Sequence, residues 1–112
     1  MEKSLVVQSL AALAHEVRLS VFRLLVEAGT AGLPAGEIAD RLDIAASSLS
    51  FHLKELHHAG LLHRKQQGRS IFYAANYEAM NDLLFYLTEN CCQGQEKCPL
   101  SPLEEQLKKS YR

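Results

Sequence analysis

Cysteine is absent from the first 90 residues of this 112-residue chain, and all three cysteines lie between positions 91 and 98. No apolar run approaches the roughly 20 residues that a membrane-spanning helix needs, and the opening Met1-Glu2-Lys3-Ser4 has no feature of a signal peptide. We therefore expect a cytoplasmic protein with no membrane partner, in a compartment that keeps thiols reduced. An odd number of cysteines there argues against a disulfide framework and favours metal binding or redox chemistry.

Recognisable catalytic motifs are also missing. The chain has no Cys-x-x-Cys motif, no nucleophile–base pair and no phosphate-binding loop. It shows no internal repeat and no low-complexity tract, and its composition is that of an ordinary globular protein of one domain. We therefore expect neither enzymatic activity nor an organic cofactor.

The chain has little excess of either charge, with a formal net charge of −1, but its charges are unevenly spread. Residues 1–40 and 70–112 each carry a net charge of −2, whereas residues 41–69 hold five basic and two acidic side chains, a net charge of +3. A basic middle between acidic flanks suits local contact with a polyanion, although a solvated surface explains the same pattern.

Hydrophobic spacing predicts a run of helices followed by a hairpin. Helices are expected over residues 5–14 and 15–28, from Pro34 to about residue 43, over 46–59 and over 77–90, with a last short one over 103–109. Strands are expected over 61–66 and 70–75, around Gln67-Gly68-Arg69. This order predicts a mainly α fold with a two-stranded β-hairpin, a winged helix-turn-helix.

The helix at 46–59 has two different faces. Leu49, His52, Leu53 and Leu56 share one side and are expected to pack inward, with His52 at the edge of the core. The opposite side is hydroxylic and basic, as a helix in the major groove requires. Phe51 on that side could touch a thymine methyl group, or pack against the hairpin or a second subunit. The candidate DNA-binding residues of helix and hairpin are Ser47, Ser48, Ser50, Phe51, Lys54, Arg64, Lys65, Gln67 and Arg69.

Two stretches resemble the ArsR/SmtB family of metal-responsive bacterial repressors. The recognition helix and wing of that family are similar to AASSLSFHLKELHHAGLLHRKQQGRSIFYA, and its opening helix is similar to LAHEVRLSVFRLLVEAG. The resemblance covers roughly residues 5–90. It implies a homodimeric repressor of double-stranded operator DNA, dimerised through its first and last helices. One domain is then expected over 1–112, with core and dimer helices over 1–90 and a cysteine-containing extension over 91–112.

The family binds metals at several places, and most of them are missing here. The region PAGEIADRLDI lacks the cysteine pair of the founding arsenic sensors, and YEAMNDLLFYLTEN lacks the histidine that zinc sensors use. An N-terminal cysteine pair, as in the cadmium sensors, is absent too. The remaining cysteines, Cys91, Cys92 and Cys98, resemble the C-terminal site of an alternative group of arsenic sensors.

The chemistry of three clustered thiols favours the same ligand. Trivalent arsenic, and antimony as a related candidate, is soft and takes three thiolates, whereas zinc usually takes four ligands. The metalloid expected at Cys91, Cys92 and Cys98 is therefore As(III), acting as an inducer that releases the repressor. A thiol-based redox switch, a Cd or Zn sensor, and tail thiols without a function remain as alternatives.

Overall fold

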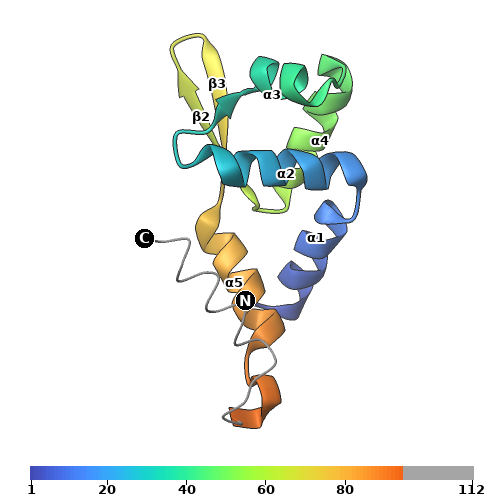
Figure 1. Cartoon of the computed structure of the whole chain (residues 1–112), viewed down its shortest axis with the longest axis vertical. Coiled ribbons are helices and arrows are strands. Elements are labelled where there is room, and N and C mark those ends of the chain that lie inside the picture. Colours follow the sequence, from blue (N-terminus) through green and yellow to red (C-terminus); the bar gives the residue numbers. More distant parts are fainter. Residues whose placement is uncertain (95–112) are drawn as a thin grey trace.

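The computed structural model describes residues 1–94, which form five α-helices and a three-stranded antiparallel sheet. In chain order these are α1 (Lys3–Leu13), α2 (Glu16–Ala28), β1 (Leu33–Pro34), α3 (Ala35–Leu42), α4 (Ala46–His58), β2 (Leu62–Gln67), β3 (Ser70–Ala75) and α5 (Tyr77–Thr88). An irregular 3-10 turn at Cys91–Gly94 follows. Figure 1 shows α2 across the middle, with α3 and the β2–β3 hairpin on one side and α1 and α5 on the other. The helix predicted over 103–109 lies outside the described residues.

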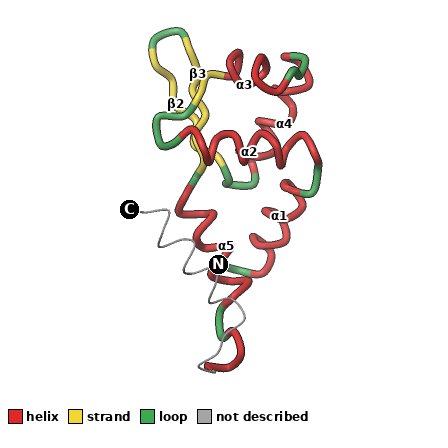
Figure 2. Tube along the Cα trace, viewed as in Figure 1, coloured by secondary structure: helices red, strands yellow, loops and turns green. Residues whose placement is uncertain are grey.

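The order of elements confirms the predicted winged helix-turn-helix, with one addition. The short strand β1 pairs with β3, so that Leu33 lies opposite Tyr73 and Pro34 opposite Phe72. Figure 2 shows the strands gathered on one side of a mainly helical molecule. Pro34, predicted in the first turn of a helix, is instead the residue that precedes α3. The sequence did not predict β1 because two residues carry no readable alternation.

Gly32 allows β1 to approach β3 closely. Its φ is +71°, and a Cβ atom at this position would lie 2.3 Å from the carbonyl oxygen of Tyr73. Both the backbone conformation and the contact therefore require glycine. The loop after α2 is in this way held directly against the wing.

The main core lies between α2, α3, α4 and the sheet. Val21 and Leu25 of α2, Ile38 of α3, Leu56 of α4 and Leu61 just after it are all 0% exposed. Burial of each such side chain contributes roughly 1.5–3 kcal/mol to the free energy of folding. The core therefore fixes the helix-turn-helix pair, α3 and α4, on α2.

The helices α1 and α5 contact one another away from that core. Tyr77 at the start of α5 donates its hydroxyl to the Val26 carbonyl at 2.8 Å, which ties α5 to α2. Val6 of α1 and Leu83 of α5 are buried, but many apolar neighbours on these two helices are exposed. Within residues 1–94 no single helix is long and apolar enough to cross a membrane. Only α1 and α2 taken together reach that length and composition, and these two helices are bent by 101° relative to one another.

Candidate nucleic-acid interface

Packing fixes which face of α4 points outward. Leu49, Leu53 and Leu56 are at most 2% exposed and His52 is 8% exposed, as the helical spacing predicted. The candidate residues Ser47, Ser48, Ser50, Phe51 and Lys54 are exposed. The core side of α4 is thus fixed by packing, and the opposite face is open to a partner.

The beginning of α4 suits an approach to phosphate. Ala45 precedes the helix without a side-chain cap, and its first turn carries no acidic residue. The backbone N–H groups of a first helical turn and the helix dipole both favour an anion there. The Ser50 hydroxyl donates its hydrogen to the Ala46 carbonyl at 3.0 Å. The oxygen of the exposed Ser50 side chain therefore remains available as an acceptor. Phe51 is 55% exposed, and its ring meets that of His52 edge-on at 5.6 Å between centroids.

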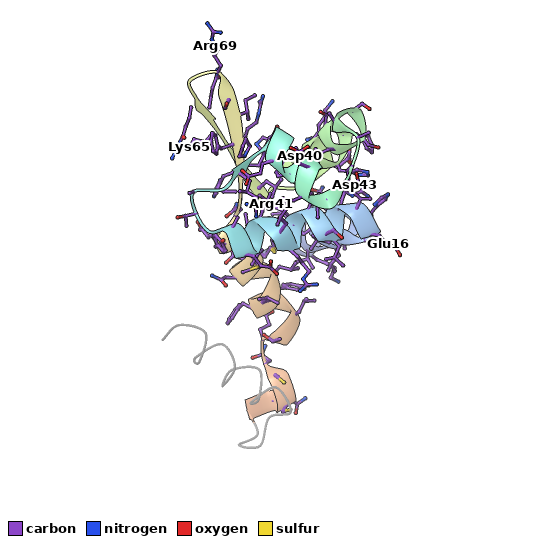
Figure 3. All side chains as sticks on the ribbon, turned by 45° about the horizontal axis from the view of Figure 1, so that its top comes forward. Glu16, Asp40, Arg41, Asp43, Lys65 and Arg69 are labelled. Carbon is purple, nitrogen blue, oxygen red and sulfur yellow. The ribbon has the colours of Figure 1, made fainter. Side chains whose placement is uncertain are left out.

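The β2–β3 hairpin presents its basic residues around an exposed tip. Arg64, Lys65, Gln67 and Arg69 are exposed, and Gly68 supplies the positive φ of the turn. Figure 3 shows Arg69 projecting from the tip, away from the helices, and Lys65 on the outer side of the hairpin. A cation at such a tip can reach the DNA backbone beside the groove that a recognition helix enters.

Strand alternation separates two neighbouring cations. Arg64 pairs with Tyr73 and Lys65 with Phe72, so their side chains leave opposite faces of the hairpin. Arg64 and Gln66 line a shallow groove with His57, at the end of α4. Gln66 and His57 are not among the residues predicted to contact DNA, because only the pairing register of β2 with β3, combined with the end of α4, indicates that they lie beside Arg64.

The remaining charges near the motif are less available. Arg41 of α3, one of the basic residues of the charged middle, binds Glu37 at 2.6 Å on the helix surface. This exposed i,i+4 ion pair is weak and offsets the charge of Arg41 only in part. Within residues 41–69, the cations without a carboxylate partner are those of α4 and the hairpin.

Cys91 and Cys92 lie at the far end of the described structure from this surface (Figure 1). The helix α5 ends at Thr88, two residues before the predicted end, because Glu89 leaves the helical conformation with a ψ of 141°, and Asn90 then takes a left-handed φ of 59°. Cys91 and Cys92 follow, with 3.7 Å between their sulfur atoms. Within residues 1–94 no three His, Cys, Asp or Glu side chains gather as a metal-binding group. Cys98 lies outside the described residues.

Comparisons with known proteins agree with this architecture. A family model described as "Helix-turn-helix domain" matches residues 13–65, which include α2, α3, α4 and the start of the hairpin. The transcriptional activator HlyU of Vibrio cholerae is 30% identical over 87 residues, 78% of each chain. The structure of an ArsR-like transcriptional regulator from Rhodococcus sp. RHA1 superposes with a TM-score of 0.71 at 26% identity, covering 80% of this chain and 82% of that one. The chain belongs to the ArsR/SmtB family.

Membership of the ArsR/SmtB family makes the chain a transcriptional regulator with a helix-turn-helix DNA-binding domain, and its relatives are regulators, not enzymes. A further solved structure, described as a possible transcriptional regulator for arsenical resistance, superposes with a TM-score of 0.61 at 25% identity, covering 71% of this chain and 80% of that one. In this ArsR/SmtB chain α4 occupies the position of the recognition helix and the hairpin that of the wing.

Proposed function

We propose that this regulator is a homodimeric repressor which trivalent arsenic releases from operator DNA. The inducer would bind three thiolates, Cys91, Cys92 and Cys98, with antimony as a related ligand. The DNA would contact Ser47, Ser48, Ser50, Phe51 and Lys54 of α4, together with Arg64, Lys65, Gln67 and Arg69 of the wing. The similarity to a protein described as a possible transcriptional regulator for arsenical resistance supports this choice of inducer.

The observation that carries the proposal is the convergence of two thiols at the end of α5. The Cys91 and Cys92 sulfurs lie 3.7 Å apart. Metal–sulfur bonds of about 2.3 Å allow two sulfurs on one atom to be separated by at most roughly 4.6 Å. A single soft ion could therefore bind both sulfurs with little further movement. Left-handed backbone at Asn90, Cys92 and Gln93 turns the chain sharply there, with φ angles of 59°, 56° and 51°.

Dimerisation through α1 and α5 is supported by the apolar side chains that these helices leave exposed. Val7 and Leu5 of α1 are 58% and 46% exposed, and Leu87 and Leu84 of α5 are 55% and 43% exposed. Between α2 and α5 runs an apolar groove of about 380 Å³, lined by residues such as Leu19, Phe22 and Met80. A second copy of the chain would cover this surface. The two recognition helices would then lie roughly 34–36 Å apart, one turn of DNA.

The thiol site would act through α5. This helix joins the cysteine turn at one end to Tyr77, which is bonded to α2, at the other. Binding of three thiolates would reshape the end of α5 in the dimer and change the spacing of the recognition helices. A coupling free energy of about 1–3 kcal/mol, typical of allostery, would lower the affinity for the operator by roughly 5- to 150-fold.

The test is a set of single variants, Cys91→Ser, Cys92→Ser and Cys98→Ser, with Gln93→Ser as the matched control in the same turn. Each cysteine variant should repress as the wild type does and fail to respond to arsenite, because a serine hydroxyl cannot replace a soft thiolate. The Gln93 variant should release normally. X-ray absorption of the wild-type complex should show three sulfurs around arsenic and no nitrogen.

Other outcomes would identify other functions. Arsenite release that survives in Cys98→Ser would reduce the site to the adjacent pair and overturn the three-thiolate arrangement. Release of the wild type by peroxide without metal would indicate the redox switch, and release by Cd or Zn alone would indicate a divalent-metal sensor. Because the relative HlyU is described as an activator, transcription should be measured from a reporter with and without the protein. An increase by the metal-free protein would contradict repression.

A further inference from the structure

Arg18 connects three helices at the inner side of the recognition helix. It belongs to α2, and its Nε donates a hydrogen bond of 2.6 Å to the Ala12 carbonyl at the end of α1. A second nitrogen of the same guanidinium lies 3.5 Å from Nδ1 of His52, which is 8% exposed in the buried face of α4. The contact therefore spans the C-terminal end of α1, the beginning of α2 and the middle of α4.

This geometry favours a neutral histidine. Arginine has only donors, so a hydrogen bond across this 3.5 Å contact needs Nδ1 of His52 as the acceptor and the ring proton on Nε2. The charged and titratable groups around the ring are His15 and Arg18, at the start of α2, and Glu55 of α4 itself. The rings of His15 and His52 lie 4.6 Å apart at an angle of 47°. From α1 the contributing group is the Ala12 carbonyl, which Arg18 binds.

The electrostatic balance opposes a second positive charge at this point. Burial lowers the pKa of His52, as do His15 and the Arg18 guanidinium, whereas Glu55 acts in the opposite direction. Because the pKa in the folded protein lies below its ordinary value, the neutral ring stabilises the packed state fully above about pH 6.5. That stabilisation is lost as the pH falls through the lowered pKa, since the packed ring resists the proton that the unpacked ring accepts.

We propose that Arg18 and His52 are positioning residues, which hold the recognition helix in its DNA-binding orientation only while the His52 imidazole is neutral. Protonation of Nδ1 removes the acceptor and places two cations side by side. His52 stands between Leu49 and Leu53 on the packed face, so repulsion there pushes α4 away from α2 and α1. The proposal concerns DNA binding, which family membership establishes, and it stands whether or not arsenic is the inducer.

The sign of the pH effect distinguishes this device from ordinary electrostatics. Protonation of exposed histidines adds positive charge and strengthens binding to the DNA polyanion as the pH falls. Loss of the Arg18–His52 contact acts in the opposite direction, because a displaced helix makes fewer contacts with base edges. Specific binding should therefore weaken at low pH while binding to unrelated DNA strengthens.

The experiment measures the affinity for two DNA duplexes, one that the wild-type protein has selected from a random pool and one unrelated. Both are measured from about pH 7.5 to about pH 5.5, a range that brackets the ordinary histidine pKa. The key variant is His52→Asn, whose side-chain oxygen can accept from Arg18 but cannot take up a proton. Wild-type affinity for the selected duplex should fall roughly fivefold or more, the lower end of typical coupling factors. His52→Asn should bind the duplex at the upper pH and lose this fall. His63→Asn, an exposed control on the hairpin, should keep it.

Arg18 supplies the second arm of the experiment. Arg18→Lys keeps the charge but not the planar fork that reaches two acceptors at once, so its specific affinity should be reduced at the upper pH and depend less on pH. Arg18→Gln should show a larger loss. Thermal unfolding and sedimentation of every variant at each pH confirm that folded, equally assembled protein is compared. Parallel pH profiles for the wild type and His52→Asn, or unchanged binding by both Arg18 variants, would overturn the proposal.

Discussion

At the scale of single residues, the direction of a side chain matters more than its charge. Arg64 and Lys65 are neighbours with the same formal charge, yet they leave opposite faces of the hairpin. Only Arg64 joins His57 and Gln66 in the groove beside α4. The two residues therefore form a natural pair for testing which face of the wing meets DNA.

We expect Arg64→Gln to weaken binding to all duplexes by a similar factor and to reduce the slope of log affinity against log salt by about one, as loss of one phosphate contact does. The matched variant Lys65→Gln removes the same charge from the opposite face and should have a smaller effect on both quantities. Fluorescence anisotropy over a series of salt concentrations measures them. Equal losses from the two variants would mean that charge alone, and not the face, determines the contribution of the wing.

At the scale of elements, the wing depends on a strand of two residues. Pairing of β1 with β3 joins the hairpin to the loop after α2, and it brings Gly32 against the backbone of Tyr73. The wing is therefore supported from both edges of β3, by β1 and by β2. Its position relative to α4 is then determined by the sheet as a whole.

Substitution of Gly32→Ala should lower the free energy of unfolding by at least roughly 1–3 kcal/mol, because the residue would be strained at positive φ and its Cβ would overlap the Tyr73 carbonyl. Gly36→Ala is the matched control. Gly36 lies inside α3, and a methyl group added there would meet open space, so alanine should raise stability by about 0.5–1 kcal/mol. Denaturant unfolding compares the two, and a neutral Gly32→Ala would contradict the close approach of β1.

At the scale of the whole molecule, the DNA-binding half and the apolar half lie on opposite sides of α2 (Figure 1). Met80, Leu83, Leu84 and Leu87 recur at helical spacing along α5, but they do not share one environment in the folded protomer. Leu83 is 6% exposed and belongs to the protomer itself, whereas Leu84 and Leu87 are open to a partner. A substitution at Leu83 would therefore test folding, and one at Leu84 or Leu87 tests association.

For this reason we expect the Leu84→Asp protein to be folded but monomeric, as measured by sedimentation. It should bind the operator more weakly than the wild-type dimer does. A carboxylate buried without a partner in the interface would cost more than association can supply. Asn81→Asp adds the same charge to an exposed polar position of α5 and should remain dimeric. Circular dichroism checks that both are folded. A Leu84→Asp protein that stays dimeric and active would place the interface elsewhere.

Local sequence was sufficient to predict much of this molecule. The 3.6-residue spacing of Leu49, Leu53 and Leu56 predicted the inner face of α4, and the extended segments on either side of Gly68 predicted the hairpin, because both signals arise from near neighbours along the chain. The clustering of the cysteines is likewise a property of the sequence, and their role as a metalloid site stays a prediction.

Tertiary structure alone decided the contacts between distant segments. The pairing of Leu33 with Tyr73, the choice of Arg64 over Lys65 on the α4 side, and the burial of Leu83 beside the exposed Leu84 each depend on residues far away along the chain. Arg18 and His52 are 34 positions apart, and nothing in either segment indicates the other. The contact of Arg18 with His52 depends on the packing of α1, α2 and α4, because packing sets the distance between the two side chains and excludes water, which lowers the pKa of a histidine at the edge of the core.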